Sequence, residues 1–170
     1  MPDVRPFILT LALDAELAQT LNALRTRHFP PERNFLAAHV TLFHALPGER
    51  EAALRGDLME VCAATPPFGV TLPRLHHWGK GVFAELESSD LLRVRESLKT
   101  RWSDALTRQD RQGYRPHVTL QNKVPKDEAA ALYAQLSATW RPLRGDALGL
   151  ELWRSAGGPW EYADRFDFAG

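Results

Sequence analysis

The chain has 170 residues, is 44% hydrophobic and 25% charged, and carries a formal net charge of zero at pH 7. This composition is that of an ordinary soluble globular protein, and the zero net charge leaves only a local basic patch to attract a polyanion. Cys62 is the only cysteine, which excludes a disulfide framework and a cysteine-based zinc site and fits a reducing cytoplasm. The apolar run at 7–13 is too short to span a membrane and lacks the cleavage pattern of a signal peptide. We therefore expect a cytoplasmic protein with no membrane segment.

The first half of the chain predicts alternating strands and helices. Apolar runs indicate strands, and an N-cap at Asp14 followed by leucines at i, i+4, i+7 spacing indicates the first helix. Proline pairs at 30–31 and 66–67 end helices. The expected elements are a strand at 5–13, a helix at 15–28, a loop at 31–37, a strand at 38–45, a helix at 49–63, and strands at 68–77 and 81–88 joined by a turn at 78–81.

The second half repeats this order of elements. The expected elements are a helix at 90–108, a loop at 109–115, a strand at 116–123, a helix at 125–139, and strands at 143–154 and 160–168 joined at 156–159. Helix, strand, helix, strand, strand therefore occurs twice, which indicates an internal duplication. We predict a bilobed α+β fold in which two mostly antiparallel sheets line a central cleft, with helices on the outside. Residues 1–170 would form one domain of two pseudo-symmetric lobes, about 1–88 and 89–170, with some exchange of strands.

One short pattern occurs in each half, at the same place in the order of elements. It reads His-Val-Thr-Leu at 39–42 and again at 117–120, so the copies lie 117 − 39 = 78 positions apart. Because side chains alternate along a strand, His and Thr would share one face while Val and Leu enter the core. Two such strands would present two imidazoles to one phosphate, where a neutral ring accepts a proton and a protonated ring donates one. A single copy is more often a half-buried strand, but two equivalent copies favour a catalytic site.

The candidate site follows from these motifs and their flanks. The candidate catalytic residues are His39 and His117, and the candidate phosphate-binding residues are Thr41 and Thr119. Strand parity or proximity to the second motif adds four candidate substrate contacts, which are Phe43, Arg115, Gln121 and Lys123. We assign His117 as the base and His39 as the acid, although the pseudo-symmetry of the motifs leaves this polarity almost open. The chemistry requires no metal and no cofactor.

The chain resembles the 2H phosphoesterase superfamily, which is defined by two His-x-Thr-x motifs, and in particular its 2′-5′ RNA ligase and 2′,3′-cyclic phosphodiesterase group. The resemblance covers essentially the whole chain and includes the opening stretch at 5–9 and Pro116. It implies metal-independent hydrolysis of 2′,3′-cyclic phosphate ends of RNA or nucleotides to 2′-phosphates, and in some members reversible 2′-5′ ligation. The group often carries an arginine soon after the second motif, whereas this chain continues Gln121-Asn122-Lys123. RNA ends or cyclic nucleotides are the implied partners, and we expect a monomer.

Three alternatives stay open. The main role could be 2′-5′ RNA ligation, or the chain could be a non-catalytic RNA- or nucleotide-binding module, or it could be a metal hydrolase. The adjacent pair His76-His77 does not favour a metal, because neighbouring side chains on a strand face opposite ways. Aromatic residues such as Trp78 and Trp160 could stack on a base, although aromatics in strands are more often part of the core.

Overall fold

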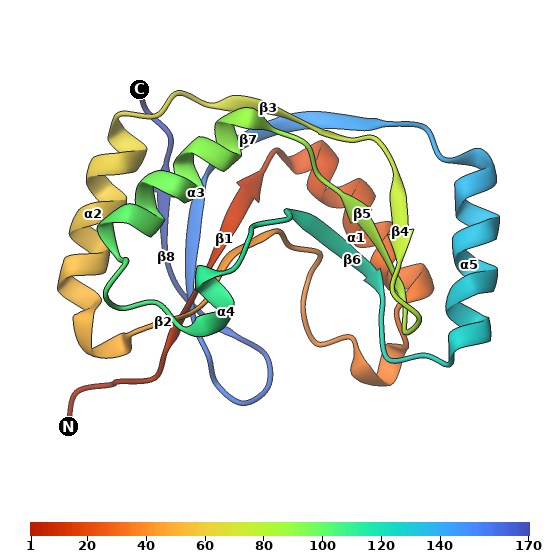
Figure 1. The fold of residues 1–170 in the computed structure, drawn as a ribbon, viewed down its shortest axis with the longest axis horizontal. Helices are drawn as coiled ribbons and strands as arrows, with labels where there is room; N and C mark the ends of the chain where they lie inside the picture. Colours follow the sequence, from red (N-terminus) through yellow and green to blue (C-terminus); the bar gives the residue numbers. More distant parts are fainter.

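A computed structural model describes residues 1–170, which form two antiparallel sheets surrounded by helices (Figure 1). The elements are β1 (Phe7–Leu13), α1 (Ala15–His28), η1 (Pro31–Arg33), β2 (Thr41–Leu46), η2 (Gly48–Arg50), α2 (Glu51–Ala63), β3 (Phe68–Leu72), β4 (Leu75–His77), β5 (Val82–Glu85), α3 (Ser89–Arg101), α4 (Arg108–Arg111), β6 (His117–Gln121), α5 (Lys126–Thr139), β7 (Leu143–Arg154) and β8 (Glu161–Asp167), where η marks a 3₁₀ helix.

The larger sheet has the strand order β2-β1-β7-β3, and β8 pairs with the C-terminal half of β7. The smaller sheet has the order β4-β5-β6. Every strand pair is antiparallel, which confirms the predicted α+β class. In Figure 1, α2 and α3 lie together at one end of the molecule and α5 lies at the other end, beyond the small sheet.

Each sheet takes strands from both halves of the chain. β7 and β8 complete the larger sheet beside β1, while β6 joins β4 and β5 in the smaller one. The predicted single strand at 68–77 is wrong, because it divides around Pro73 into β3 and β4, which belong to different sheets. A proline has no N–H to continue the ladder, so the chain changes sheets there. The division into lobes near residue 88 stays a prediction.

Most other boundaries follow from local signals. The carboxylate of Asp14 accepts a hydrogen bond from the Leu17 N–H at 2.9 Å, so α1 begins where the N-cap predicts. The predicted helix at 90–108 is too long, because α3 ends at Arg101 and a separate turn of helix, α4, follows. One cluster of 33 buried residues joins both sheets and the helices. No helix is long and apolar enough to cross a membrane.

Candidate active site

The second motif lies on β6, whereas the strand predicted at 38–45 begins only at Thr41, so His39 and Val40 lie just before β2. β2 and β6 belong to different sheets. The Val and Leu side chains of both motifs are at most 1% exposed and belong to the core, whereas each His and Thr is partly exposed. This is the division of faces that the alternation predicts. The Tyr114 hydroxyl, just before β6, donates to the carbonyl oxygen of Thr41 on β2 at 2.9 Å and so joins the two motif segments.

The two imidazoles are oriented in the same way. Nδ1 of His39 lies 2.8 Å from the carbonyl oxygen of Ala37, and Nδ1 of His117 lies 2.8 Å from that of Arg115. A carbonyl oxygen only accepts hydrogen bonds, so Nδ1 carries the proton in both rings. Nε2 is therefore the atom that can take a proton from a substrate or, once protonated, give one. The repeated motif thus produces a repeated geometry as well as a repeated sequence.

His39 lies in surroundings that oppose its protonation. Burial is the main cause that lowers the pKa of His39 to about 4; the hydrogen bond to Ala37 opposes it, and the positive charges of Arg25 and His117 add to it. The ring of Trp160 packs edge-on against His39 with centroids 4.8 Å apart. His39 is therefore uncharged at neutral pH in the free protein.

Sequence reasoning missed Arg25, a buried arginine on α1. Its side chain is 5% exposed, donates to Oδ1 of Asn34 at 2.9 Å and to the carbonyl oxygen of Thr119 at 3.0 Å, and lies 4.1 Å from the ring centroid of Phe29. Both hydrogen-bond acceptors are neutral, and no carboxylate oxygen lies within 4.0 Å. A buried cation without a counter-charge is costly unless an anion compensates it. The sequence offered one signal of this burial, because Arg25 follows the buried Leu21 by four residues and so lies on the same face of α1.

A second buried arginine supports the other motif strand. Arg95 on α3 donates from Nε to the carbonyl oxygen of Leu42 at 3.0 Å and from Nη2 to that of Asp110 at 2.7 Å. Its guanidinium lies 4.1 Å from the ring centroid of Phe43. Each motif strand is therefore held by one buried arginine that stacks on a phenylalanine and binds a backbone carbonyl. Arg25, however, lines the cavity beside His39, whereas Arg95 does not.

The predictions for Phe43 and Gln121 as substrate contacts are wrong, because both side chains are buried. Phe43 is 0% exposed, and Gln121 is 4% exposed. The register of each motif strand shifts by one residue directly after its threonine, at Leu42 in β2 and at Leu120 in β6. A β-bulge of this kind inverts the alternation of side chains beyond it. Oε1 of Gln121 has no hydrogen-bond partner.

Lys123 and Arg115 lie on different sides of the site. Lys123, in a left-handed conformation with φ of 64°, lines the cavity that contains His39 and Thr119. Arg115 lines a separate cavity beside Phe83, and its backbone carbonyl is the group that orients His117. Lys123 therefore lies in the cavity of His39 and Thr119 although it follows the end of β6, whereas the side chain of Arg115 lines the other cavity. Whether either contacts substrate stays a prediction.

The cavity at the motifs has a volume of about 440 Å³. His39 and Thr119, one residue from each motif, line it together with Arg25, whereas His117 and Thr41 do not. The loop between β7 and β8 contributes Gly157 and Gly158, and it lies on the same side of the molecule as the segment that precedes β2 (Figure 1). This arrangement brings together imidazole, hydroxyl and guanidinium groups, which suits the binding of a phosphate.

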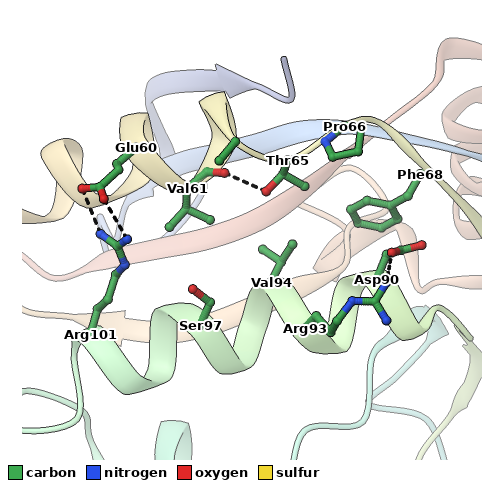
Figure 2. Close-up of a pocket in the computed structure, with 11 residues that line it drawn as sticks. Glu60, Val61, Thr65, Pro66, Phe68, Asp90, Arg93, Val94, Ser97 and Arg101 are labelled. Atoms are coloured by element: carbon green, nitrogen blue, oxygen red, sulfur yellow. Dashed lines mark hydrogen bonds and ion pairs between the residues drawn. The ribbon is translucent and has the colours of Figure 1, made fainter. Parts of the chain in front are cut away.

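A larger cavity of about 490 Å³ lies elsewhere, between α2 and α3 (Figure 2). It contains none of the motif residues. Its charged groups are already paired, Arg101 with Glu60 and Arg93 with Asp90, as Figure 2 shows. No group of three or more His, Cys, Asp or Glu side chains is arranged to hold a metal ion.

A family model described as the 2′-5′ RNA ligase superfamily matches residues 13–159. The chain belongs to this superfamily, the 2H phosphoesterases. Solved structures of similar fold include TT0787 of Thermus thermophilus, which is 19% identical over 97% of this chain and 98% of that one, with a TM-score of 0.68. E. coli LigT complexed with 3′-AMP is 19% identical over 99% and 100% of the two chains, with a TM-score of 0.67. No curated protein sequence matches the chain.

In this 2H phosphoesterase a guanidinium from another element contacts the second motif strand. Gln121-Asn122-Lys123 follows the motif in place of the arginine that the group often carries, and the first of these side chains is buried. Arg25 reaches the carbonyl of Thr119 from α1 instead. A guanidinium is thus present beside the second motif, although it lies far from that motif in the sequence.

Proposed function

We propose that this 2H phosphoesterase hydrolyses 2′,3′-cyclic phosphate ends of RNA or nucleotides to 2′-phosphates, without a metal ion, through His39 and His117. The observation that carries the proposal is the matched orientation of the two imidazoles, each held through Nδ1 by the carbonyl two residues earlier. A nucleotide substrate is supported by E. coli LigT, whose structures were solved with 3′-AMP, NADP⁺ and ATP.

The reaction needs one proton acceptor and one proton donor. A water molecule attacks phosphorus while the base removes its proton, and the P–O3′ bond breaks as the acid protonates the leaving O3′. We assign His39 as the base and His117 as the acid, which reverses the polarity taken from the sequence. His39 lies against Trp160 and the charge of Arg25, where the neutral ring is favoured. A bound phosphate adds negative charge, which raises the pKa of His39 and strengthens it as a base.

The remaining groups stabilise charge on the phosphate. The hydroxyls of Thr41 and Thr119 are the donors expected to hold the non-bridging oxygens. Arg25 uses two of its five N–H groups for Asn34 and Thr119, so three remain for an anion in the cavity that it lines. Removing even one such donor from an active site commonly costs roughly 10²–10³-fold in rate. The buried guanidinium is therefore assigned to charge stabilisation.

A substrate panel with an analysis of product position tests the proposal. Adenosine 2′,3′-cyclic phosphate, a short RNA with a cyclic end and a small alkyl cyclic phosphate are incubated with the protein in excess chelator. We expect 2′-phosphate products from the first two. Loss of activity in chelator, or no turnover of any compound, would overturn the proposal.

Two further expectations accompany this function. Ligation is the same ring opening with a 5′-hydroxyl in place of water as the nucleophile, so an RNA with a cyclic end and a second RNA with a 5′-hydroxyl should yield some 2′-5′-joined product at high concentration. The amount of joined product relative to hydrolysis decides whether ligation is the main role. We also retain the expectation of a cytoplasmic protein, since Cys62 is the only cysteine, and separately the expectation of a monomer.

A further inference from the structure

The cavity beside His39 holds more positive charge than one phosphate needs. Arg25, Arg33 and Lys123 line it, and no Asp or Glu does. Arg25 donates a hydrogen bond to the carbonyl oxygen of Thr119, and the proposed function places the reacting phosphate beside this residue. Arg33, in η1, and Lys123, after β6, are exposed and have no carboxylate oxygen within 4.0 Å. Two cations in one cavity therefore lack a counter-charge.

An exposed aromatic ring accompanies these two cations. Phe35 lies in the wall of the same cavity and is 62% exposed, although large apolar side chains are usually covered. Nucleobases stack readily on such rings. The cavity volume of about 440 Å³ lies in the range of pockets that hold small organic ligands, so it has room beyond the reacting phosphate.

The opposite side of the site has a different charge. A cavity of about 320 Å³ lies around Phe83, whose ring packs edge-on against His117 with centroids 5.1 Å apart. Glu85 and Glu87, which both pair with Arg74, line this cavity together with His76 and Arg115. A phosphate there would meet two carboxylates and one guanidinium. Additional phosphate is therefore favoured only on the basic side, beyond the reacting phosphate.

We infer that Arg33, Lys123 and Phe35 form a second anion subsite that takes a further phosphate and its neighbouring base. The preferred substrate is then a cyclic phosphate that carries a second phosphate, rather than a simple cyclic mononucleoside phosphate. This inference rests on the proposed function and narrows its substrate class. The second phosphate has two chemical sources, the 5′-phosphate of the same nucleotide or the phosphodiester that links the preceding nucleotide of an RNA.

Three adenosine substrates separate these sources. They are adenosine 2′,3′-cyclic phosphate, the same compound with a 5′-phosphate, and the dinucleotide ApA with a 2′,3′-cyclic end. We expect kcat/KM to rise about tenfold when a second phosphate is present, mainly through KM, because charge-assisted contacts add to binding. A gain for the 5′-phosphate compound identifies a nucleotide phosphate, and a gain for the dinucleotide alone identifies the RNA backbone. Equal kcat/KM for all three substrates would overturn the inference.

A double variant tests the named residues. Arg33→Gln with Lys123→Asn removes both charges, and Asn tolerates the left-handed conformation at position 123. The matched control, Lys99→Gln with Arg141→Gln, removes one partly exposed and one exposed charge outside the cavity and changes the net charge equally. We expect the tenfold ratio between substrates to fall to about one in the first double variant and to persist in the control. An unchanged ratio in the first variant would overturn the assignment.

Binding measurements separate failure of the subsite from failure of the proposed function. Adenosine 3′,5′-bisphosphate and adenosine 3′-monophosphate are compared by calorimetry with the wild-type protein, which needs no turnover. Tighter binding of the bisphosphate, lost in the Arg33→Gln, Lys123→Asn variant, supports the subsite even if no cyclic phosphate is hydrolysed. Equal affinity for both ligands, with cyclic phosphate hydrolysis intact, rejects the subsite alone.

Discussion

Replacement of Arg25 by methionine should abolish most of the activity while the protein remains folded. The substitution removes hydrogen bonds to Asn34 and Thr119, and each bond from a charged donor contributes about 1.5–3 kcal/mol. It also removes a buried charge that has no carboxylate partner, and burial of such an ion costs several kcal/mol. The methionine still packs against Phe29. The opposing effects should leave the free energy of unfolding within about 2 kcal/mol of wild type, or a Tm shift below about 8 °C.

The catalytic effect should be much larger. With the guanidinium gone, charge on the phosphate loses its buried partner, and we expect kcat/KM for adenosine 2′,3′-cyclic phosphate to fall roughly 10²–10³-fold. Arg95→Met is the matched control, because Arg95 is also buried and stacked on a phenylalanine but does not line the site cavity. It should lose stability and retain kcat/KM within about tenfold of wild type. An Arg25→Met enzyme with kcat/KM within about threefold of wild type would refute the reasoning.

Three further predictions concern protonation and folding. In the free protein, His39 should titrate by NMR near pH 4. Because an unfolded histidine titrates near pH 6.5, this group lowers the free energy of unfolding as the pH drops from about 6.5 towards 4. A titration midpoint at or above pH 6.5 would contradict the account. Asp110→Ala should cost about 3–5 kcal/mol in urea unfolding, because this fully buried carboxylate accepts hydrogen bonds from two backbone N–H groups of β2; a loss below about 1 kcal/mol would argue against it. Gly81→Ala should lower the free energy of unfolding by about 2 kcal/mol or more, since the added Cβ would lie 1.9 Å from the carbonyl oxygen of Gln121. The control Gly56→Ala, which has open space around it in α2, should raise the free energy of unfolding by about 0.5–1 kcal/mol in the same assay.

Local signals in the sequence predict much of the fold. The bounds of α1 and β7 agree with the expected helix at 15–28 and strand at 143–154, because the N-cap Asp14 marks the start of the helix, and Pro142 and the turn at 156–159 bound the strand. The break at Pro73 was also available from the sequence, since proline interrupts a strand. Local patterns do not specify which strands pair, and it is this pairing that places β3 and β4 in different sheets.

The candidate site was predicted less completely beyond the motifs. The bulges after Thr41 and Thr119 depend on how β2 and β6 pair with β1 and β5, and the sequence of one strand does not specify that pairing. Alternation along the strand therefore placed the side chains of Phe43 and Gln121 on the wrong face. Arg25 lies far from both motifs in sequence, and only tertiary packing brings it to Thr119. The roles of the motif histidines and threonines remain predictions that measurements of activity must test.

The central claim is that the two motif histidines perform acid–base catalysis on a cyclic phosphate. The most direct measurement is kcat for adenosine 2′,3′-cyclic phosphate, in chelator, with His39→Ala and His117→Ala compared with wild type. Calorimetric binding of adenosine 3′-monophosphate by each variant shows whether the site is still formed. The account predicts that each substitution lowers kcat by about 10²–10⁴-fold while binding persists. Wild-type kcat in either variant, or equal near-zero hydrolysis in all three proteins, would contradict it.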